Sequence, residues 1–385
     1  MPSEFSLIDR YFKRAAPAGM LGVGDDCALF APPAGMQVAT STDLLIEGRH
    51  FFADADPRAV GHKSLAVNLS DLAAMGARPL ACLLGLSLPR VDEAWLAAFA
   101  EGFHALAQAS GCALIGGDTT SGPNIAISVT VFGAVAPADA LRRSGARPGD
   151  DIWVSGELGA ADIAYRLLAG EMPPDAALLA QVRGALEWPQ PRLALGAALA
   201  GVASAAIDIS DGLCQDLRHI LQASGVGAEL DVARLPVAAA LKQVNPDRVN
   251  PDRVNPDRVN PDRVNPDRVD ADRVDADRVD ADRVDADRVD ADRVDADRVD
   301  AHRVDAHRID PDRVRHALLG GGDVYELCFT ASPARADAVL AAAHASATPV
   351  TRVGRIVAGD TLHVRSADGT LLADLPRGFD HFQES

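Results

Sequence analysis

The chain has 385 residues, 48% of them apolar, which is enough for two domains that each bury a core. Its formal net charge of −18 excludes a general nucleic-acid-binding protein, because such proteins need a basic face to neutralise phosphates. The sequence has no apolar run of about 18 residues, no apolar leader and no CxxC pair, so we expect a cytoplasmic protein without a membrane span, secretory signal, zinc site or disulfide framework.

Strands and helices are predicted to alternate in the first domain, residues 1–146. Alternating or continuous apolar runs predict strands at 37–45, 81–89, 112–120 and 124–136. Apolar residues at helical spacing predict helices at 57–77 and 92–111. Gly76 and Gly111 provide the stop signals of these two helices.

A second domain is predicted from 147 to 385, opening at the Pro-Gly-Asp turn in 147–156. Its expected helices lie near 158–170, 191–201, 213–224 and 333–345. Its expected strands lie at 205–210 and 325–330, with further strands near the C-terminus. Because both halves mix strands and helices, we predict an α/β or α+β fold of two domains.

Residues 245–314 repeat with a strict period of five. The units are five NPDRV, six DADRV, and one each of DAHRV, DAHRI and DPDRV. Successive valines would advance about 140° on a helix, so no apolar stripe forms, and each unit offers little apolar surface to offset the entropy of ordering. We therefore interpret the block as a solvated, disordered insertion. A pentapeptide β-coil and a binding arm remain open.

Five short loops place Asp beside Gly, Ser or Thr near the ends of predicted strands and helices. They are GVGDDCA (22–28), STDLL (41–45), NLSDLAAMGA (68–77), GGDTTSGP (116–123) and IDISDGL (207–213). Each Asp alone could be a helix cap or turn residue. Five such loops in one chain predict clustered carboxylates, which repel one another unless divalent cations lie between them. Oxygen donors without His or Cys suit Mg²⁺ rather than zinc.

Mg²⁺ held by several Asp is typical of phosphate chemistry. The chain has no GxxxxGK[ST] motif and only three lysines, Lys13, Lys63 and Lys242, so we expect metals, backbone N–H groups and Arg to hold the phosphates. Arg142 and Arg143 in RRSGARPGD form a candidate phosphate clamp, with a solvated turn as the alternative. Lys63 is interpreted as a solvated charge on a helix.

Seven segments, in this order along the chain, resemble the thiamine-monophosphate kinase family. They are GVGDDCAL, STDLLIEGRHF, KSLAVNLSDLAAMGA, IGGDTTSGP, LRRSGARPGD, AIDISDGL and RGFDHF. The resemblance implies ATP-dependent phosphorylation of thiamine monophosphate to thiamine diphosphate, by direct in-line transfer without a phosphoenzyme. It also implies a homodimer in which the N-terminal ATP- and Mg²⁺-binding domains join their sheets.

The resemblance further implies the roles of individual residues. The Mg²⁺ ligands, several ions per site, would be Asp26, Ser41, Thr42, Asp43, Asp71, Asp118, Asp208 and Asp211. The residues around ATP would be Gly117, Asp118, Arg143 and Ser210, and those around the thiamine substrate would be His50, Asp323 and Phe379. The chief catalytic roles would fall to Asp43, Asp118, Arg143 and Asp211.

One segment departs from the family pattern. The chain reads GGGDVYEL where the family usually shows GGEDYEL. Aligned on Tyr325, Asp323 replaces a Glu and Val324 replaces an Asp, so substrate binding could be impaired. Two alternatives therefore stay open, a degenerate non-catalytic nucleotide-binding homologue and another ATP-using synthetase of the superfamily.

Overall fold

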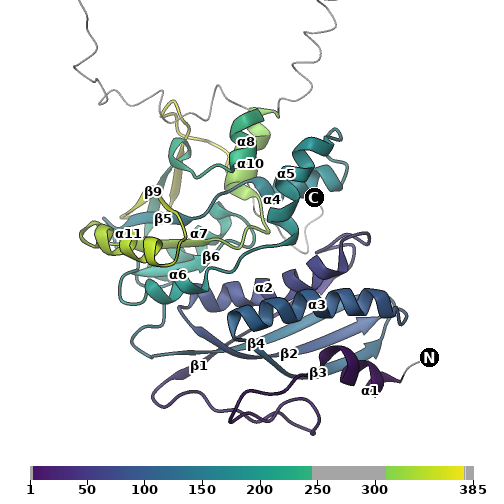
Figure 1. Cartoon of the computed structure of the whole chain (residues 1–385). Coiled ribbons are helices and arrows are strands. Elements are labelled where there is room, and N and C mark those ends of the chain that lie inside the picture. Colours follow the sequence, from purple (N-terminus) through teal and green to yellow (C-terminus); the bar gives the residue numbers. More distant parts are fainter. Residues whose placement is uncertain (1–2, 245–308, 377, 379–385) are drawn as a thin grey trace, which may run out of the picture.

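A computed structural model describes residues 3–244, 309–376 and 378, which form two α/β domains stacked on one another (Figure 1). The N-terminal domain has a four-stranded sheet in the order β1-β4-β2-β3. Its strands are β1 (Gln37–Ile46), β2 (Arg78–Leu88), β3 (Ala113–Ser121) and β4 (Ala126–Val135). The pair β2–β3 is parallel, and β4 runs antiparallel to β1 and β2.

Two long helices cover one face of this sheet, α2 (Pro57–Ala74) and α3 (Glu93–Ser110), and the chain begins with α1 (Glu4–Leu7) and a π-turn at Ile8–Phe12 (Figure 1). The start of α2 is fixed by Asp56, whose carboxylate accepts the N–H of Arg58 at 3.0 Å. Nearly every residue of α2 is buried, because the helix lies between the sheet, α3 and the second domain.

The C-terminal domain has a six-stranded sheet in the order β10-β7-β9-β5-β8-β6. Its strands are β5 (Asp151–Ser155), β6 (Ala205–Asp208), β7 (Gly227–Asp231), β8 (Leu327–Ala331), β9 (Val350–Val357) and β10 (Leu362–Arg365). Its helices are α4 (Ala160–Leu168), α5 (Ala176–Glu187), α6 (Leu193–Ala198), α7 (Leu213–Ser224), α8 (Ala239–Val244), α10 (Pro311–Gly320) and α11 (Ala336–Ala345). Short 3₁₀ turns lie at Val232–Arg234 and Pro333–Arg335.

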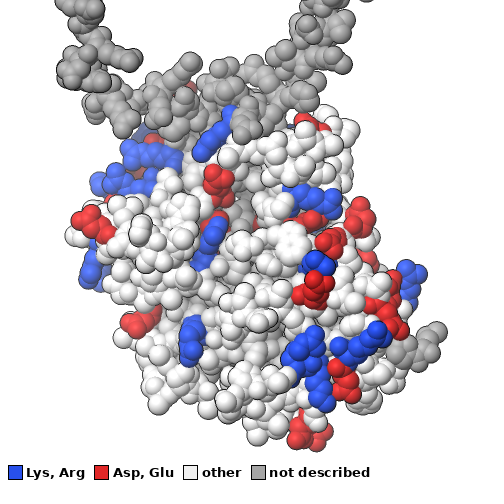
Figure 2. Space-filling model, in the orientation of Figure 1, with Lys and Arg blue, Asp and Glu red and all other residues white. Residues whose placement is uncertain are grey.

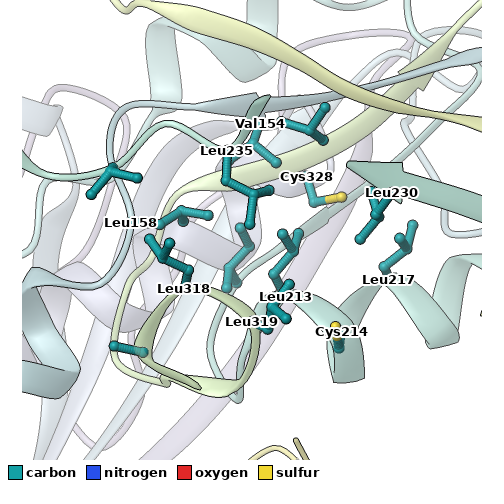
Figure 3. Packing of buried hydrophobic residues seen from close by; sticks show 14 of the residues in the cluster. Val154, Leu158, Leu213, Cys214, Leu217, Leu230, Leu235, Leu318, Leu319 and Cys328 are labelled. Carbon is teal, nitrogen blue, oxygen red and sulfur yellow. The ribbon is translucent and has the colours of Figure 1, made fainter. Parts of the chain in front are cut away.

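The core of this domain lies between the sheet and helices α7 and α10 (Figure 3). Leu213 and Leu217 of α7 and Leu319 of α10 are fully buried there, against strand residues such as Val154 and Cys328. On the outer surface, acidic and basic side chains are interspersed over both domains (Figure 2). None of the helices that the structure describes is both long and apolar enough to cross a membrane.

The expected mixture of strands and helices in both halves is confirmed. The elements that were not predicted are α1, the short π and 3₁₀ turns, β5, α5, β7, α8 and α10. Residues 245–308 lie outside the described part of the chain, so the interpretation of most of the repeat stays a prediction. For residues 309–314 the prediction of disorder is wrong, because Ile309 is buried and Asp310 caps α10 by accepting the N–H of Asp312 at 3.0 Å.

Helices α2 and α3 approach each other backbone to backbone at two glycines. A Cβ on Gly61 would lie 2.0 Å from the carbonyl oxygen of Phe99, and one on Gly102 would lie 1.9 Å from that of Arg58. Since neither oxygen can move without shifting its helix, only glycine fits at these positions.

We predict that Gly102→Ala lowers the free energy of unfolding by about 1–3 kcal/mol, because the added methyl group forces the two helices apart. The matched control is Gly184→Ala in α5, where nothing lies within 4 Å of the added Cβ. There the better helix propensity of Ala should raise stability by roughly 0.5–1 kcal/mol. Urea unfolding followed by circular dichroism measures both, and equal effects of the two substitutions would contradict the prediction.

Candidate active site

Three carboxylates from separate segments approach one another where the two domains touch. Asp43 lies on β1, Asp71 on α2 and Asp208 at the end of β6. The Ser41 hydroxyl donates a 2.6 Å hydrogen bond to Asp71, and the Ser70 hydroxyl donates a 2.8 Å bond to Asp208. The second bond joins α2 of one domain to β6 of the other, which places this carboxylate cluster at the domain junction.

Burial and mutual repulsion shift the pKa values of the cluster upward. Burial, together with the charge of Asp71, raises the pKa of Asp43 to about 6. Burial, followed by the charge of Asp71, raises the pKa of Asp208 to about 8. Burial also raises the pKa of Asp71, against the opposing effects of the Ser41 hydrogen bond and the Arg143 charge. The cluster therefore holds more negative charge than its surroundings compensate when all three groups are ionised.

The loop after Asp208 is held by a residue that sequence analysis missed. One oxygen of Asp216, in the first turn of α7, accepts the backbone N–H groups of Ser210, Asp211 and Gly212 at 3.0–3.1 Å. The side chain of Gln215 donates a 3.2 Å bond to Asp211. Burial and the Asp211 charge raise the pKa of Asp216 to about 7. Its place four residues after Gly212, in the first turn of a helix, is the sequence signal that could have identified it.

The segment before β8 packs against the same loop. Asp323 and Tyr325 have positive φ angles of 59° and 54°, and their N–H groups bond the carbonyls of Ser210 and Ile209, both at 2.8 Å. The Tyr325 hydroxyl donates a 3.0 Å bond to Asp323, and the ammonium of Lys63 lies 3.0 Å from the same carboxylate. The prediction that Lys63 is a solvated charge is wrong, because only 4% of the residue is exposed.

A buried ion pair fixes the chain directly after Tyr325. Arg192 donates from Nε to Glu326 at 2.7 Å, and its Nη2 bonds the other oxygen. The Ser155 hydroxyl also donates to Glu326. Gly156 must be glycine, since its φ is 60° and a Cβ would lie 1.9 Å from the same carboxylate. This pair ties the site segment to β5 and to the start of α6.

A pocket opens beside these groups and is lined by both domains. Its walls include aromatic and charged side chains from each domain: His50, Phe51, Phe52, Tyr165, Glu187 and Asp323. The rings of Phe52 and Tyr165 are 5.8 Å apart across the domain boundary. The Nδ1 atom of His50 accepts the N–H of Ile46 at 3.0 Å, which holds the imidazole against the end of β1.

Arg143 lies in an exposed loop near the carboxylate cluster. The Ser224 hydroxyl donates to the Arg143 carbonyl at 3.1 Å and accepts the N–H of Gly145 at 3.1 Å, which ties the loop to the end of α7. The guanidinium is close enough to lower the pKa of Asp71 against the effect of burial. Arg143 is therefore the cation that the fold brings toward the cluster.

The structure does not bring every predicted residue to the cluster. Asp26 and Asp118 are exposed, and in the described part of the chain neither is hydrogen-bonded to the three carboxylates. The hydroxyl of Thr42 bonds Thr130 at 2.9 Å on the sheet face opposite Ser41 and Asp43. Gly117 has a packing reason to be glycine, since a Cβ would lie 1.9 Å from the Leu84 oxygen. Phe379 lies outside the described residues.

Oxygen donors of this kind could hold a hard divalent cation. Within residues 3–244 and 309–376, however, no group of three or more His, Cys, Asp or Glu side chains is already arranged to hold a metal ion. The predicted ligands are thus partly assembled: Asp43, Asp71 and Asp208 interact, Asp211 lies in the adjoining loop, and the exposed Asp26 and Asp118 stand apart.

Comparison with known proteins relates this arrangement to a family. Residues 24–135 match the family model described as AIR synthase related protein, N-terminal domain. A thiamine-monophosphate kinase of Salmonella typhimurium is 46% identical over 245 residues, covering 62% of this chain and 74% of the relative.

Solved structures agree with this relationship. The crystal structure of thiamine-monophosphate kinase from Stenotrophomonas maltophilia superimposes with a TM-score of 0.72 at 38% identity, covering 96% of this chain and 98% of the other. A structure of AaThiL complexed with AMPPCP and TMP superimposes with a TM-score of 0.65 at 25% identity, covering 98% and 97%. From its sequence identity and coverage, the chain belongs to the thiamine-monophosphate kinase family.

Proposed function

We propose that this protein transfers the γ-phosphoryl group of ATP to the phosphate of thiamine monophosphate, producing thiamine diphosphate and ADP. The observation that supports the proposal is a largely buried carboxylate cluster at the domain junction, beside an aromatic pocket that both domains line. Relatives 46% identical are thiamine-monophosphate kinases, and a relative of known structure is complexed with AMPPCP and TMP. The family membership makes another synthetase of the superfamily the weaker alternative.

The pocket suits the thiamine part of the substrate. Thiamine has a flat pyrimidine and a cationic thiazolium ring, and aromatic faces attract both. Phe52 and Tyr165 supply such faces. We assign the substrate contacts to this pocket, with His50 and Asp323 as the predicted residues nearest to it.

The carboxylate cluster suits Mg²⁺. Asp43, Asp71 and Asp208 offer only oxygen donors. Burial raises the pKa of all three, and the charge of Asp71 adds to the shift at Asp43 and Asp208, so a divalent cation there would favour the ionised carboxylates. Bound there, Mg²⁺ would supply neutralisation of charge on the transferring phosphoryl group. Arg143 would add a fixed positive charge. The acceptor oxygen belongs to a phosphate already ionised near neutral pH, so direct in-line transfer requires no strong general base.

The remaining assignments stay proposals. We infer that Gly117, Asp118 and Ser210 face ATP, and that Asp26, Thr42 and Asp211 complete the metal ligands. We also propose a homodimer formed through the N-terminal domains in the cytoplasm. Its support here is β1, an edge strand on which Val38 and Leu44 are 44% and 52% exposed.

The first test is ADP release from ATP and Mg²⁺, with and without thiamine monophosphate. We expect release to depend on thiamine monophosphate and to fall by about 100-fold or more in Asp71→Asn, because one proposed ligand of Mg²⁺ is lost. Asp139→Asn, in an exposed turn, is the matched control and should behave as the unchanged protein. Bound ATP with no transfer in the unchanged protein would instead support the degenerate nucleotide-binding homologue.

Two deletions test whether the repeat is needed. Replacing 245–308 by a short Gly-Ser linker should leave turnover and melting temperature within error of the full chain. Deleting 245–314 should lower the melting temperature, because Ile309 and Val314 are 6% and 4% exposed and Asp310 caps α10. For both variants, thermal unfolding measures the melting temperature and the ADP assay measures turnover. Loss of turnover in the shorter deletion would give the repeat a role in activity.

Stability should depend on pH in a direction set by the carboxylate cluster. The folded state holds the Asp208 proton more tightly than the unfolded chain, where the pKa is near 3.8, so this stabilisation is complete below pH 3.8 and is lost as the pH rises through about 8. In EDTA, the melting temperature should therefore fall between pH 6 and about 9. Mg²⁺ should restore it most at the alkaline end.

Asp208→Asn should flatten this pH profile, whereas Asp139→Asn should keep it. Two results would contradict the proposal that the carboxylate cluster binds Mg²⁺. One is the same alkaline loss of stability in Asp208→Asn, and the other is a Mg²⁺ effect that is equal at both ends of the pH range.

A further inference from the structure

Lys63 is set apart from the other lysines of the chain. The sequence has three lysines, and Lys13 and Lys242 are exposed while Lys63 is 4% exposed. It lies on α2, a helix of the N-terminal domain, at the wall of the pocket shared by both domains. An ammonium group is buried at such a cost that it needs fixed partners.

The partners of this ammonium come from the two domains that line the pocket. Nζ donates to the carbonyl oxygen of His50 at 3.2 Å, in the loop that follows β1. It also lies 3.0 Å from Oδ1 of Asp323, in the segment that precedes β8 of the C-terminal domain. A single side chain thus joins a pocket segment of one domain to a pocket segment of the other.

Lys63 contacts a segment, Asp323 to Tyr325, whose backbone conformation is strained. Asp323 and Tyr325 both have φ angles in the left-handed region, which non-glycine residues keep only when surrounding contacts require it. The Tyr325 hydroxyl donates to the same Oδ1 atom of Asp323 that faces Lys63. Tyr325 in turn is close enough to Asp43 and Asp208 for their charges to raise its pKa, after the larger effect of burial and that of Asp323. Lys63, Asp323 and Tyr325 therefore form a chain of contacts that runs from the pocket toward the carboxylate cluster.

We propose that Lys63 is a positioning residue for thiamine monophosphate: by bonding His50 and Asp323 together it sets the spacing of the two pocket walls relative to the carboxylate cluster. This inference rests on the proposed function. It assigns Lys63 no contact with ATP and no proton transfer. Its effect should therefore fall on binding of the acceptor rather than on binding of the nucleotide.

The test is steady-state kinetics of Lys63→Met, with Lys242→Met as the matched control. We expect the KM for thiamine monophosphate to rise at least ten-fold in Lys63→Met while the KM for ATP stays within two-fold. Lys242→Met, which loses an exposed lysine, should match the unchanged protein. Equal increases in both KM values, or a lower kcat with both KM values unchanged, would overturn the proposal, since a purely structural role predicts those results.

A double-mutant cycle asks whether Lys63 acts through Asp323. If it does, Lys63→Met/Asp323→Asn should raise the KM for thiamine monophosphate no further than the worse single variant. If the KM of the double variant instead rises by the product of the two single increases, the proposal is overturned. Should Lys63→Met fail to fold, Lys63→Arg replaces it. Its larger, planar head keeps the charge but not the two-sided geometry, so it should raise the KM for thiamine monophosphate alone.

Titration calorimetry with thiamine monophosphate and a non-hydrolysable ATP analogue separates this proposal from the proposed function. If the unchanged protein binds thiamine monophosphate without turnover, the proposed function fails, yet weaker binding of this ligand to Lys63→Met still supports the role of Lys63. If the unchanged protein does not bind thiamine monophosphate at all, both proposals fall.

Discussion

Three carboxylates that repel one another lie close together at the junction of the two domains, Asp208 buried and Asp43 and Asp71 half-buried, and much of the surrounding structure keeps them there. The hydroxyls of Ser41 and Ser70 donate to two of them. Asp208 reaches the cluster from the second domain, so bringing these charges together also brings the domains together. A protein selected for stability alone would not collect uncompensated charge in its interior. The arrangement is understandable as a site for a cationic ligand, because binding such a ligand would relieve the repulsion between the carboxylates and so strengthen its affinity.

Helix α2 is the element that makes this arrangement possible. Over nine residues it carries Lys63, Ser70 and Asp71 to the site, and its Asn68 accepts the N–H of Asp43 at 3.1 Å, fixing the neighbouring strand. A helix with polar groups needed on several sides cannot show one apolar stripe, and α2 is correspondingly buried on all sides. Its place is set by the glycine contacts with α3 and by Gly196 of α6, where a Cβ would lie 2.0 Å from the oxygen of Ala73. Backbone-to-backbone packing thus determines the geometry of the charged groups.

Most helices and strands could be predicted from local sequence patterns. The features that were missed depend on contacts between residues far apart in the sequence. The strands and the two long helices of the first domain were predictable because their apolar runs and stop signals lie in neighbouring residues. The acidic loops were visible for the same reason, but which of their Asp residues meet depends on strand order, so the sequence could not separate Asp43 and Asp71 from the exposed Asp118. The burial of Lys63 depends on its ion pair with Asp323, which follows it by hundreds of positions. Local sequence patterns cannot predict a pair of residues so far apart in the chain. The short helix α8 was missed because it directly precedes the repeat.

The departure from the family motif acquires a physical explanation in this structure. Ile209 donates its N–H to the carbonyl of Glu326 and accepts the N–H of Tyr325 at 2.8 Å, so two residues lie opposite one, as in a β-bulge. A bulge absorbs one extra residue, and the positive φ of Tyr325 suits its first position. Val324, which stands where the family pattern has Asp, packs its side chain on the C-terminal core. Asp323 keeps a charged partner in Lys63, so the altered motif retains its link to the site and gives little reason to regard the chain as a degenerate binder.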